Sequence, residues 1–276
     1  MAILSACLIA VLVALYALQR RLIYFPGRIR RADFDAIVQG SLGDQVSVLA
    51  PFDAIVFEPP QTASVAATAI LFHGNAGLAL ERAYLAPTFT GRGLRLVLAE
   101  YPGYGARGGT PTERSLVQDA TALCAEVLAS YPNSPIVLVG ESLGAGVAVQ
   151  VAARMVTPPL RLVLLTPFLS LAETAARVYR FLPVRHLVKD RFDSAGQLPG
   201  YRGTVAILVA GEDEVVGASQ GRALAALSRL RGDTVYVELP AGHNSWPALI
   251  SDAQWTELLG SPAAAWVRDS GSAVAS

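Results

Sequence analysis

The chain has 276 residues, enough for one large domain or at most two small ones with a sizeable core. Its 22 basic and 22 acidic side chains cancel, and hydrophobic residues make up 53% of the sequence. Such a charge balance argues against a nucleic-acid binder. The two cysteines, Cys7 and Cys124, provide neither a disulfide framework nor a thiolate metal cluster, so we expect no metal and no cofactor.

The N-terminal segment is apolar from Ala2 to Leu18. At a rise of about 1.5 Å per residue, a helix over this run is near the lower limit for crossing a hydrocarbon core of about 30 Å. We therefore expect residues 1–19 to form a single-pass membrane anchor, with a cleaved signal peptide or a buried helix as alternatives. Under the positive-inside rule, the arginines after it would keep the catalytic domain in the cytoplasm: Arg20, Arg21, Arg28, Arg30 and Arg31.

Beyond the leader, strand patterns alternate with helical ones. Residues 46–60 predict early antiparallel strands. Apolar segments of strand length follow at 67–74, 94–103, 134–140, 160–168, 204–213 and 233–240. Helical patterns lie between and after them, at 80–93, 111–132, 143–155, 219–230 and 247–260. This order predicts parallel βαβ units and hence a doubly wound, mostly parallel α/β sheet.

One long interruption separates two of these strands. Residues 169–203 contain two short helical patterns and predict a small helical lid within a domain that spans residues 20–260. The last residues, 261–276, predict a flexible tail. Seven apolar positions of the insert exceed what two short surface helices need, so we expect the lid to line an acyl pocket, with a plain structural cap as the alternative. These positions are Leu169, Leu171, Val178, Phe181, Leu182, Leu187 and Val188.

A serine lies at the end of one predicted strand, where functional residues of such sheets collect. Ser142 is the centre of Gly140-Glu141-Ser142-Leu143-Gly144, a G-x-S-x-G sequence between a strand and a helix. That setting is typical of a nucleophile elbow, in which the serine occupies a strained turn and its neighbours must be small. A serine that only caps the following helix is the alternative.

A serine hydroxyl needs a general base, and the base needs a third group to orient it. Asp213 and His243 follow the last two predicted strands, so the three residues occur in the order Ser, acid, His. His243 would take the proton of Ser142 and return it to the leaving group, while Asp213 would hold the imidazole tautomer. Three further acids remain as alternatives to Asp213: Glu212, Glu214 and Asp193.

The loop after the strand at 67–74 and the start of the helix at 143–155 are expected to supply an oxyanion hole. Such a site needs two backbone N–H donors. One should be Leu143, directly after the serine, and the other Asn75, with Ala76 as the alternative. We expect His73 to brace this loop through hydrogen bonds and His186 to lie on the surface of the lid.

The loop Gly103–Gly108 matches G-x-G-x-x-G after a strand. A dinucleotide site would need a helix directly behind it and an acidic residue about 20 positions later at a strand end. Here Thr110-Pro111 intervenes, and the nearest acid, Glu126, falls inside a helical pattern. We therefore expect this loop to shape the floor of the pocket rather than to bind a nucleotide.

At this level of detail the chain resembles the α/β-hydrolases, and within them the Bem46-like subgroup with bacterial YfhR-type and vertebrate ABHD13-like members. The resemblance covers most of residues 20–247, in the stretches RRLIYFP, LFHGNAG, LAEYPGYGARGGTPTE, VGESLGAGVA, TPFLSLAETAA, FLPVRHLVKDRFDS, GEDEVV and AGHNS. It implies a membrane-anchored serine hydrolase with the triad Ser142, Asp213 and His243. One departure is that Gly217 and Ala218 stand where many relatives have proline, which makes the loop of Asp213 less rigid.

Two function classes follow from these observations. The first is a hydrolase that cleaves an ester, thioester or amide bond of a small-molecule or lipid-like acyl substrate through an acyl-enzyme on Ser142. The second is a catalytically idle scaffold of the same fold that binds an acyl ligand or a protein partner. An idle scaffold usually lacks one member of the triad, and none is missing here, so the sequence favours the hydrolase.

Overall fold

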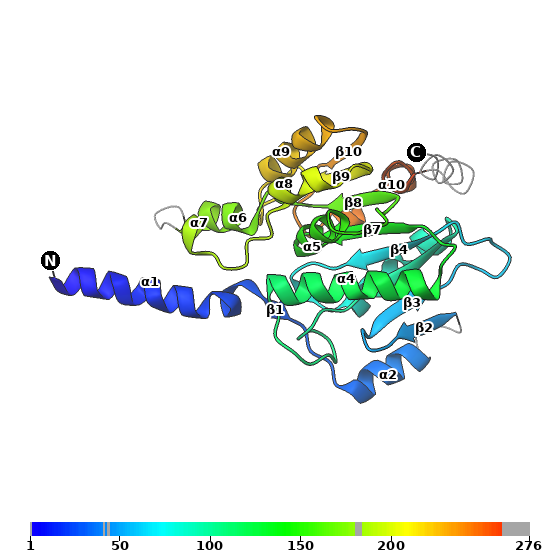
Figure 1. Cartoon of the computed structure of the whole chain (residues 1–276), viewed down its shortest axis with the longest axis horizontal. Coiled ribbons are helices and arrows are strands. Elements are labelled where there is room, and N and C mark those ends of the chain that lie inside the picture. The colour runs from blue at the N-terminus through cyan, green and yellow to red at the C-terminus, as the bar shows by residue number, and fades with distance from the viewer. Residues whose placement is uncertain (1, 41, 43–44, 180–183, 261–276) are drawn as a thin grey trace.

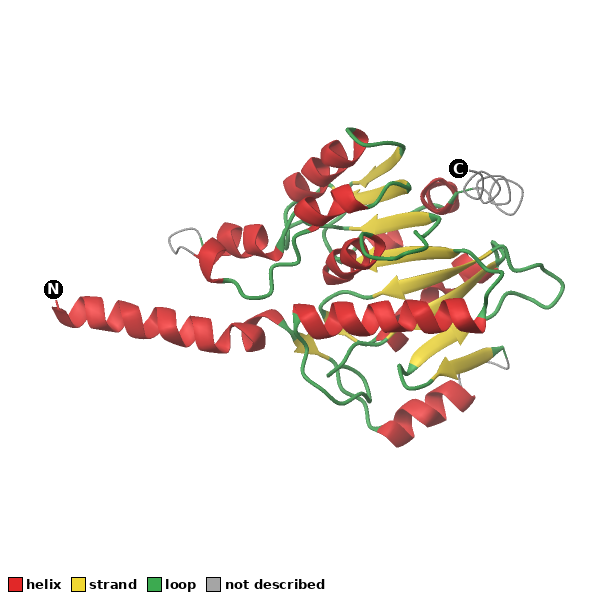
Figure 2. Ribbon diagram, in the orientation of Figure 1, coloured by secondary structure: helices red, strands yellow, loops and turns green. Residues whose placement is uncertain are grey.

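A computed structural model describes residues 2–40, 42, 45–179 and 184–260. An eight-stranded sheet lies at its centre, with helices on both faces (Figures 1 and 2). Across the sheet the strands are β10 (Thr234–Leu239), β9 (Thr204–Ala210), β8 (Arg161–Leu165), β7 (Ile136–Glu141), β4 (Ala67–Phe72), β6 (Leu94–Ala99), β3 (Ala54–Phe57) and β2 (Val46–Leu49).

The strands from β10 to β6 run parallel, whereas β3 runs antiparallel to both β6 and β2. Every residue of β4 and β6 is buried, because both faces of the sheet are covered. The predicted doubly wound, mostly parallel sheet is therefore confirmed. The covering helices and turns are α2 (Arg31–Gly40), η1 (Ala79–Leu85), α3 (Ala86–Thr90), α4 (Glu113–Ser130), α5 (Leu143–Ala152), α9 (Ala218–Arg229), η3 (Trp246–Ala248) and α10 (Asp252–Leu259).

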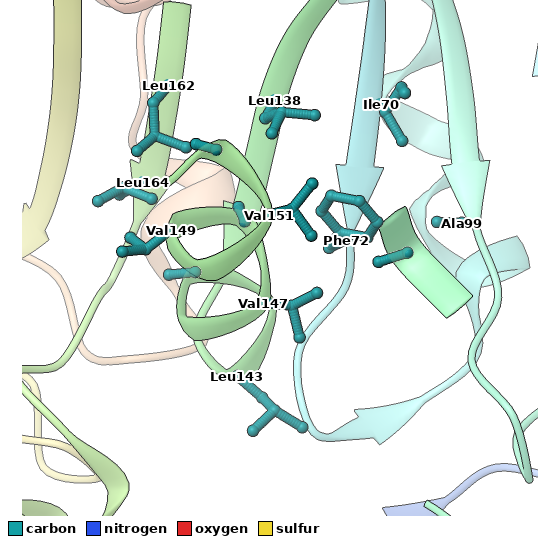
Figure 3. Packing of buried hydrophobic residues seen from close by; sticks show 14 of the residues in the cluster. Ile70, Phe72, Ala99, Leu138, Leu143, Val147, Val149, Val151, Leu162 and Leu164 are labelled. Atoms are coloured by element: carbon teal, nitrogen blue, oxygen red, sulfur yellow. The ribbon is translucent and has the colours of Figure 1, made fainter. Parts of the chain in front are cut away.

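Helix α5 is held in the core along its whole length, since all ten of its residues are buried. Figure 3 shows its valines among apolar side chains of β4, β7 and β8, such as Phe72, Leu138 and Leu164. Close packing of this kind leaves a helix little freedom to move. The start of α5, which carries the residues after Ser142, is therefore fixed relative to the carboxyl edge of the sheet.

The insert and the N-terminal segment lie at the same end of the molecule (Figure 1). The insert contains α6 (Leu171–Val178), α7 (Val184–Leu187), α8 (Ser194–Gln197) and the turn η2 (Leu198–Gly200). The N-terminal segment forms α1 (Ala2–Ile23), and β1 (Phe25–Pro26) then pairs in parallel with β5 (Ala76–Gly77) in a separate two-stranded sheet. The described part of the insert thus contains three α-helices, one more than the two that the sequence predicts.

The membrane anchor predicted for residues 1–19 is not supported. Helix α1 forms over this segment, but within the described residues no helix combines the length and the apolar character that crossing a membrane requires. Its last turn carries Arg20 and Arg21. The predicted tail, 261–276, and the lid positions Phe181 and Leu182 lie outside the described residues, as does the side chain of His186.

Candidate active site

Ser142 occupies the turn between β7 and α5 with strained backbone dihedrals. Its φ is 51° and its ψ −111°, a region that residues with a side chain rarely adopt. The neighbouring glycines make the turn possible, because a side chain on Gly144 would collide with the carbonyl oxygen of Phe72. The turn is also tied to the sheet, where the N–H of Ser142 donates to the carbonyl of Leu165 at 2.9 Å.

The structure brings Ser142, His243 and Asp213 together from the loops that follow β7, β10 and β9. The Ser142 hydroxyl donates to Nε2 of His243 at 2.9 Å, and Nδ1 of His243 donates to Oδ2 of Asp213 at 2.7 Å. The imidazole and the carboxylate are both buried. These contacts assign the ring proton to Nδ1 and leave Nε2 free to accept the proton of the serine.

The second oxygen of Asp213 is held by the backbone. Its Oδ1 accepts N–H groups from Val215 and Val216 at 2.9 Å and from Gly217 at 3.2 Å. Burial alone would raise the pKa of Asp213, but the hydrogen bond and charge of His243, with the N–H groups of Gly217 and Val216, lower it below its ordinary value. Proline could not donate this bond from the position of Gly217. The carboxylate is therefore ionised at neutral pH.

The alternative acids occupy other positions. Glu214 accepts the backbone N–H of His243 at 3.3 Å, whereas the ring nitrogens bond to Asp213 and Ser142. Asp193 caps α8 by accepting the N–H of Gly196 at 3.0 Å. Glu212 is exposed at the surface. Among the described acids, the geometry therefore favours Asp213 as the partner of the imidazole.

Asn75 and Leu143 line the same cavity as Ser142. Leu143 is the first residue of α5, where N–H groups lack acceptors within the helix. The Tyr104 hydroxyl donates to the carbonyl of Asn75 at 2.9 Å, and the side chain of Asn75 donates to the carbonyl of Ile23. The predicted oxyanion residues therefore lie beside the serine. Tyr104, from the G-x-G-x-x-G loop, supports Asn75 instead of forming the expected pocket floor.

His73 braces the loop that carries Asn75, as expected. Its ring is fully buried, with Nδ1 donating to the carbonyl of Gly74 at 2.7 Å and Nε2 lying 3.0 Å from Oε1 of Glu100. Glu100 also accepts the N–H groups of Ala79 and Tyr101, each at 3.1 Å. The Glu100 carboxylate thus connects the loop after β4 with the loop after β6. Both loops lie far from Ser142 in the sequence.

One ion pair of the site has no signal in the sequence. Arg82 of η1 binds both oxygens of Glu141, through Nε at 2.8 Å and Nη2 at 2.9 Å. Glu141 fills a variable position of the G-x-S-x-G pattern, so the pattern says nothing about its role. The pair connects the serine turn to the segment after the oxyanion loop and, because it is bidentate, fixes their relative orientation.

A cavity of about 390 Å³ opens at Ser142. Four of the predicted lid positions line it, namely Leu171, Val178, Leu187 and Val188, whereas Leu169 packs against the core. None of the described residues that line it has a charged side chain. The cavity is thus suited to an apolar group rather than to an ion.

Comparison with known proteins places the chain in a family. Residues 63–202 match the family described as serine aminopeptidase, S33. An uncharacterized protein of Mycobacterium tuberculosis, Rv2307c, is 34% identical over 249 residues, which cover 85% of this chain and 83% of that protein. Lysophosphatidylserine lipase ABHD12 of Macaca fascicularis is 34% identical over 131 residues, 44% of this chain and 33% of the lipase, which supports the predicted ABHD-like subgroup.

The fold has solved counterparts. Pyrococcus furiosus esterase Pf2001 superposes with a TM-score of 0.62 at 16% identity, over 86% of this chain and 97% of the esterase. At that identity the likeness concerns the fold alone. Together with the sequence relatives, it supports the resemblance drawn from the motifs. The chain therefore belongs to the serine aminopeptidase S33 family of α/β-hydrolases, a class of serine hydrolases.

Proposed function

We propose that this protein hydrolyses esters of apolar acyl groups through an acyl-enzyme on Ser142. The observation that carries the proposal is the uncharged cavity of about 390 Å³ that opens at the hydrogen-bonded pair Ser142 and His243. An acyl chain that enters the cavity gains about 0.8 kcal/mol for each buried methylene. The same cavity would hold the acyl group while the ester carbonyl lies at the serine.

In the first half of the reaction, Ser142 Oγ attacks the carbonyl carbon while His243 Nε2 takes its proton. The N–H groups of Leu143 and Asn75 stabilise the oxyanion, and Asp213 stabilises the imidazolium. The carbon–oxygen bond to the alcohol then breaks as His243 returns the proton to it. In the second half, His243 deprotonates a water that attacks the acyl-enzyme, which releases the acid and regenerates the serine.

Two other activities are less well supported. An aminopeptidase would need a carboxylate to pair with the substrate's ammonium group, and no acidic side chain lines the described part of the cavity. An idle scaffold would have no use for the strained turn at Ser142, which costs about 1–3 kcal/mol. This chain spans about a third of the length of the relatives named lysophosphatidylserine lipase, for example 33% of the one from Macaca fascicularis. The name of these relatives indicates a lipid ester as substrate, which supports this substrate class.

The test is Ser142→Ala, assayed with p-nitrophenyl esters and a fluorophosphonate probe. We expect kcat to fall by about 10⁶-fold and probe labelling to disappear. Ser47→Ala, at an exposed position of β2, serves as the control and should keep both. Unchanged hydrolysis by Ser142→Ala would refute the acyl-enzyme, and a wild type that binds fatty acids but reacts with neither reagent would favour the scaffold.

A further inference from the structure

The second half of α1 forms one wall of the cavity. Its lining residues fall on one face of the helix, at intervals typical of a helical stripe: Leu15, Tyr16, Gln19, Leu22 and Ile23. The neighbouring residues Ala14, Ala17 and Arg21 do not line the cavity. Residues of α6 and α7 of the insert also line the cavity. These two helices and α1 lie at the same end of the molecule (Figure 1). The apolar stripe of α1 is thus part of the cavity that opens at Ser142.

Directional contacts hold α1 against the insert. The side-chain amide of Gln19 donates to the carbonyl of Leu187 at 3.2 Å and accepts the N–H of Lys189 at 2.7 Å. Arg20 binds both oxygens of Asp190, at 2.9 and 3.3 Å. The Asp190 side chain is only 6% exposed, and a buried carboxylate requires such a partner. These contacts set where α1 lies relative to the insert.

The wall has a near end and a far end relative to the serine. At the near end, Asn75 of the oxyanion loop donates to the carbonyl of Ile23. At the far end lie Leu15 and Tyr16, where the ammonium of Lys189 sits 4.0 Å from the centre of the Tyr16 ring. Leu15 and Ile23 are eight positions apart, which corresponds to about 12 Å along a helix. An acyl chain attached to the serine would meet the near end first.

We propose that α1 is a ruler for the acyl chain: the far end of its stripe sets the longest chain that the enzyme hydrolyses efficiently. This proposal rests on the ester hydrolase function above and adds the determinant of chain length. Short chains contact only the wall near Ile23, whereas long chains also bury methylenes against Leu15 and Tyr16. Each methylene buried there should raise kcat/KM by about fourfold.

The test compares Leu15→Trp with Ala14→Trp in the full-length chain. The first fills the far end of the cavity, and the second places the same side chain on the exposed, opposite face of α1. The substrates are p-nitrophenyl esters from acetate to palmitate, and fluorophosphonate labelling counts the active sites. We expect Leu15→Trp to lower kcat/KM for the longest esters at least tenfold while acetate hydrolysis and labelling stay unchanged. Ala14→Trp should retain the wild-type profile.

A second variant keeps the proposal testable if Leu15→Trp does not fold. Tyr16→Ala enlarges the far end and should shift the preferred ester to a longer chain. An unchanged chain-length profile in both cavity variants, with normal labelling, would overturn the ruler while leaving the hydrolase proposal intact. A wild type that fails to react with the probe would instead overturn the hydrolase proposal, and the ruler with it.

Discussion

At Asp213, one carboxylate oxygen serves the imidazole and the other serves the backbone. Oδ2 contacts His243, while Oδ1 accepts three N–H groups from the loop before α9. Neither oxygen can turn away without losing a partner, so the carboxylate both orients the ring and keeps its charge. Because these contacts lower the pKa of Asp213, its support is present at neutral pH and is lost only as the pH falls below the ordinary value of 3.8.

Asp213→Asn should lower kcat by about 10⁴-fold, because the amide favours the wrong imidazole tautomer. Steady-state hydrolysis of a p-nitrophenyl ester measures the loss. Glu214→Gln and Asp193→Asn are the controls, since both side chains accept backbone N–H groups and neither is hydrogen-bonded to the ring, and both should stay within about tenfold of wild type. A large loss in either control, with an active Asp213→Asn, would reassign the acid.

The sequence predicts these three residues because each follows an apolar strand, and the carboxyl ends of parallel strands share one edge of the sheet. Their contacts confirm that they meet, although their catalytic roles stay a prediction. The Arg82–Glu141 pair could not be predicted in the same way. Its members come from a turn and a strand end 59 residues apart, and no local pattern specifies which arginine meets which acid.

Among the elements, the helices of the insert contribute apolar side chains to the cavity that opens at Ser142. Val178, at the end of α6, lines the cavity yet is 61% exposed, so it tolerates a larger side chain. We expect Val178→Arg to lower kcat/KM for long-chain esters by about fourfold for each methylene displaced, and to spare acetate. Ala176→Arg is the control, because Ala176 faces a polar cleft on the outer side of α6. An equal loss for all chain lengths would identify α6 as a structural cap.

Local sequence patterns do not predict the boundaries of every helix and strand. Residues 80–93 predict one helix, but the structure has a 3₁₀ turn, η1, followed by the short helix α3 with Pro87 in its first turn. Proline removes a backbone donor and disfavours a continuous helix through the preceding residue. The pairing of β1 with β5 was missed because two residues carry no periodic signal.

At the scale of the whole molecule, the pair Arg20–Asp190 joins segments 170 residues apart in sequence. Removing the partner of a buried charge costs about 3–5 kcal/mol. Arg20 is 46% exposed, so solvent screening should reduce the effect of Arg20→Ala to about 1–2 kcal/mol. Urea unfolding measures the change, and in Arg20→Ala/Asp190→Ala part of it should be recovered. Strictly additive effects would show that the two side chains are not coupled.

The membrane anchor predicted for the N-terminal segment is the part of the sequence-based prediction that the structure does not support. The hydropathy of residues 2–18 shows that this segment is apolar. Hydropathy does not distinguish apolar side chains that face lipid from those that face a core or a cavity. The structure places Leu15, Tyr16 and Leu22 against the cavity. The contact of α1 with the insert depends on Gln19 and Arg20. Their partners are about 170 residues away in sequence, so no local window of the sequence could predict it.

The docking of α1 on the insert also has a consequence for biosynthesis. Gln19 and its partner Leu187 are 168 residues apart, so α1 leaves the ribosome long before the surface that covers it exists. Protein synthesis proceeds at about 5–20 residues per second. The insert is therefore synthesised roughly ten to thirty seconds after the apolar stripe of α1. The part of the cavity wall that is translated first thus has a partner that is translated much later. In that interval the apolar stripe of α1 lacks the surface of the insert that faces it in the folded protein.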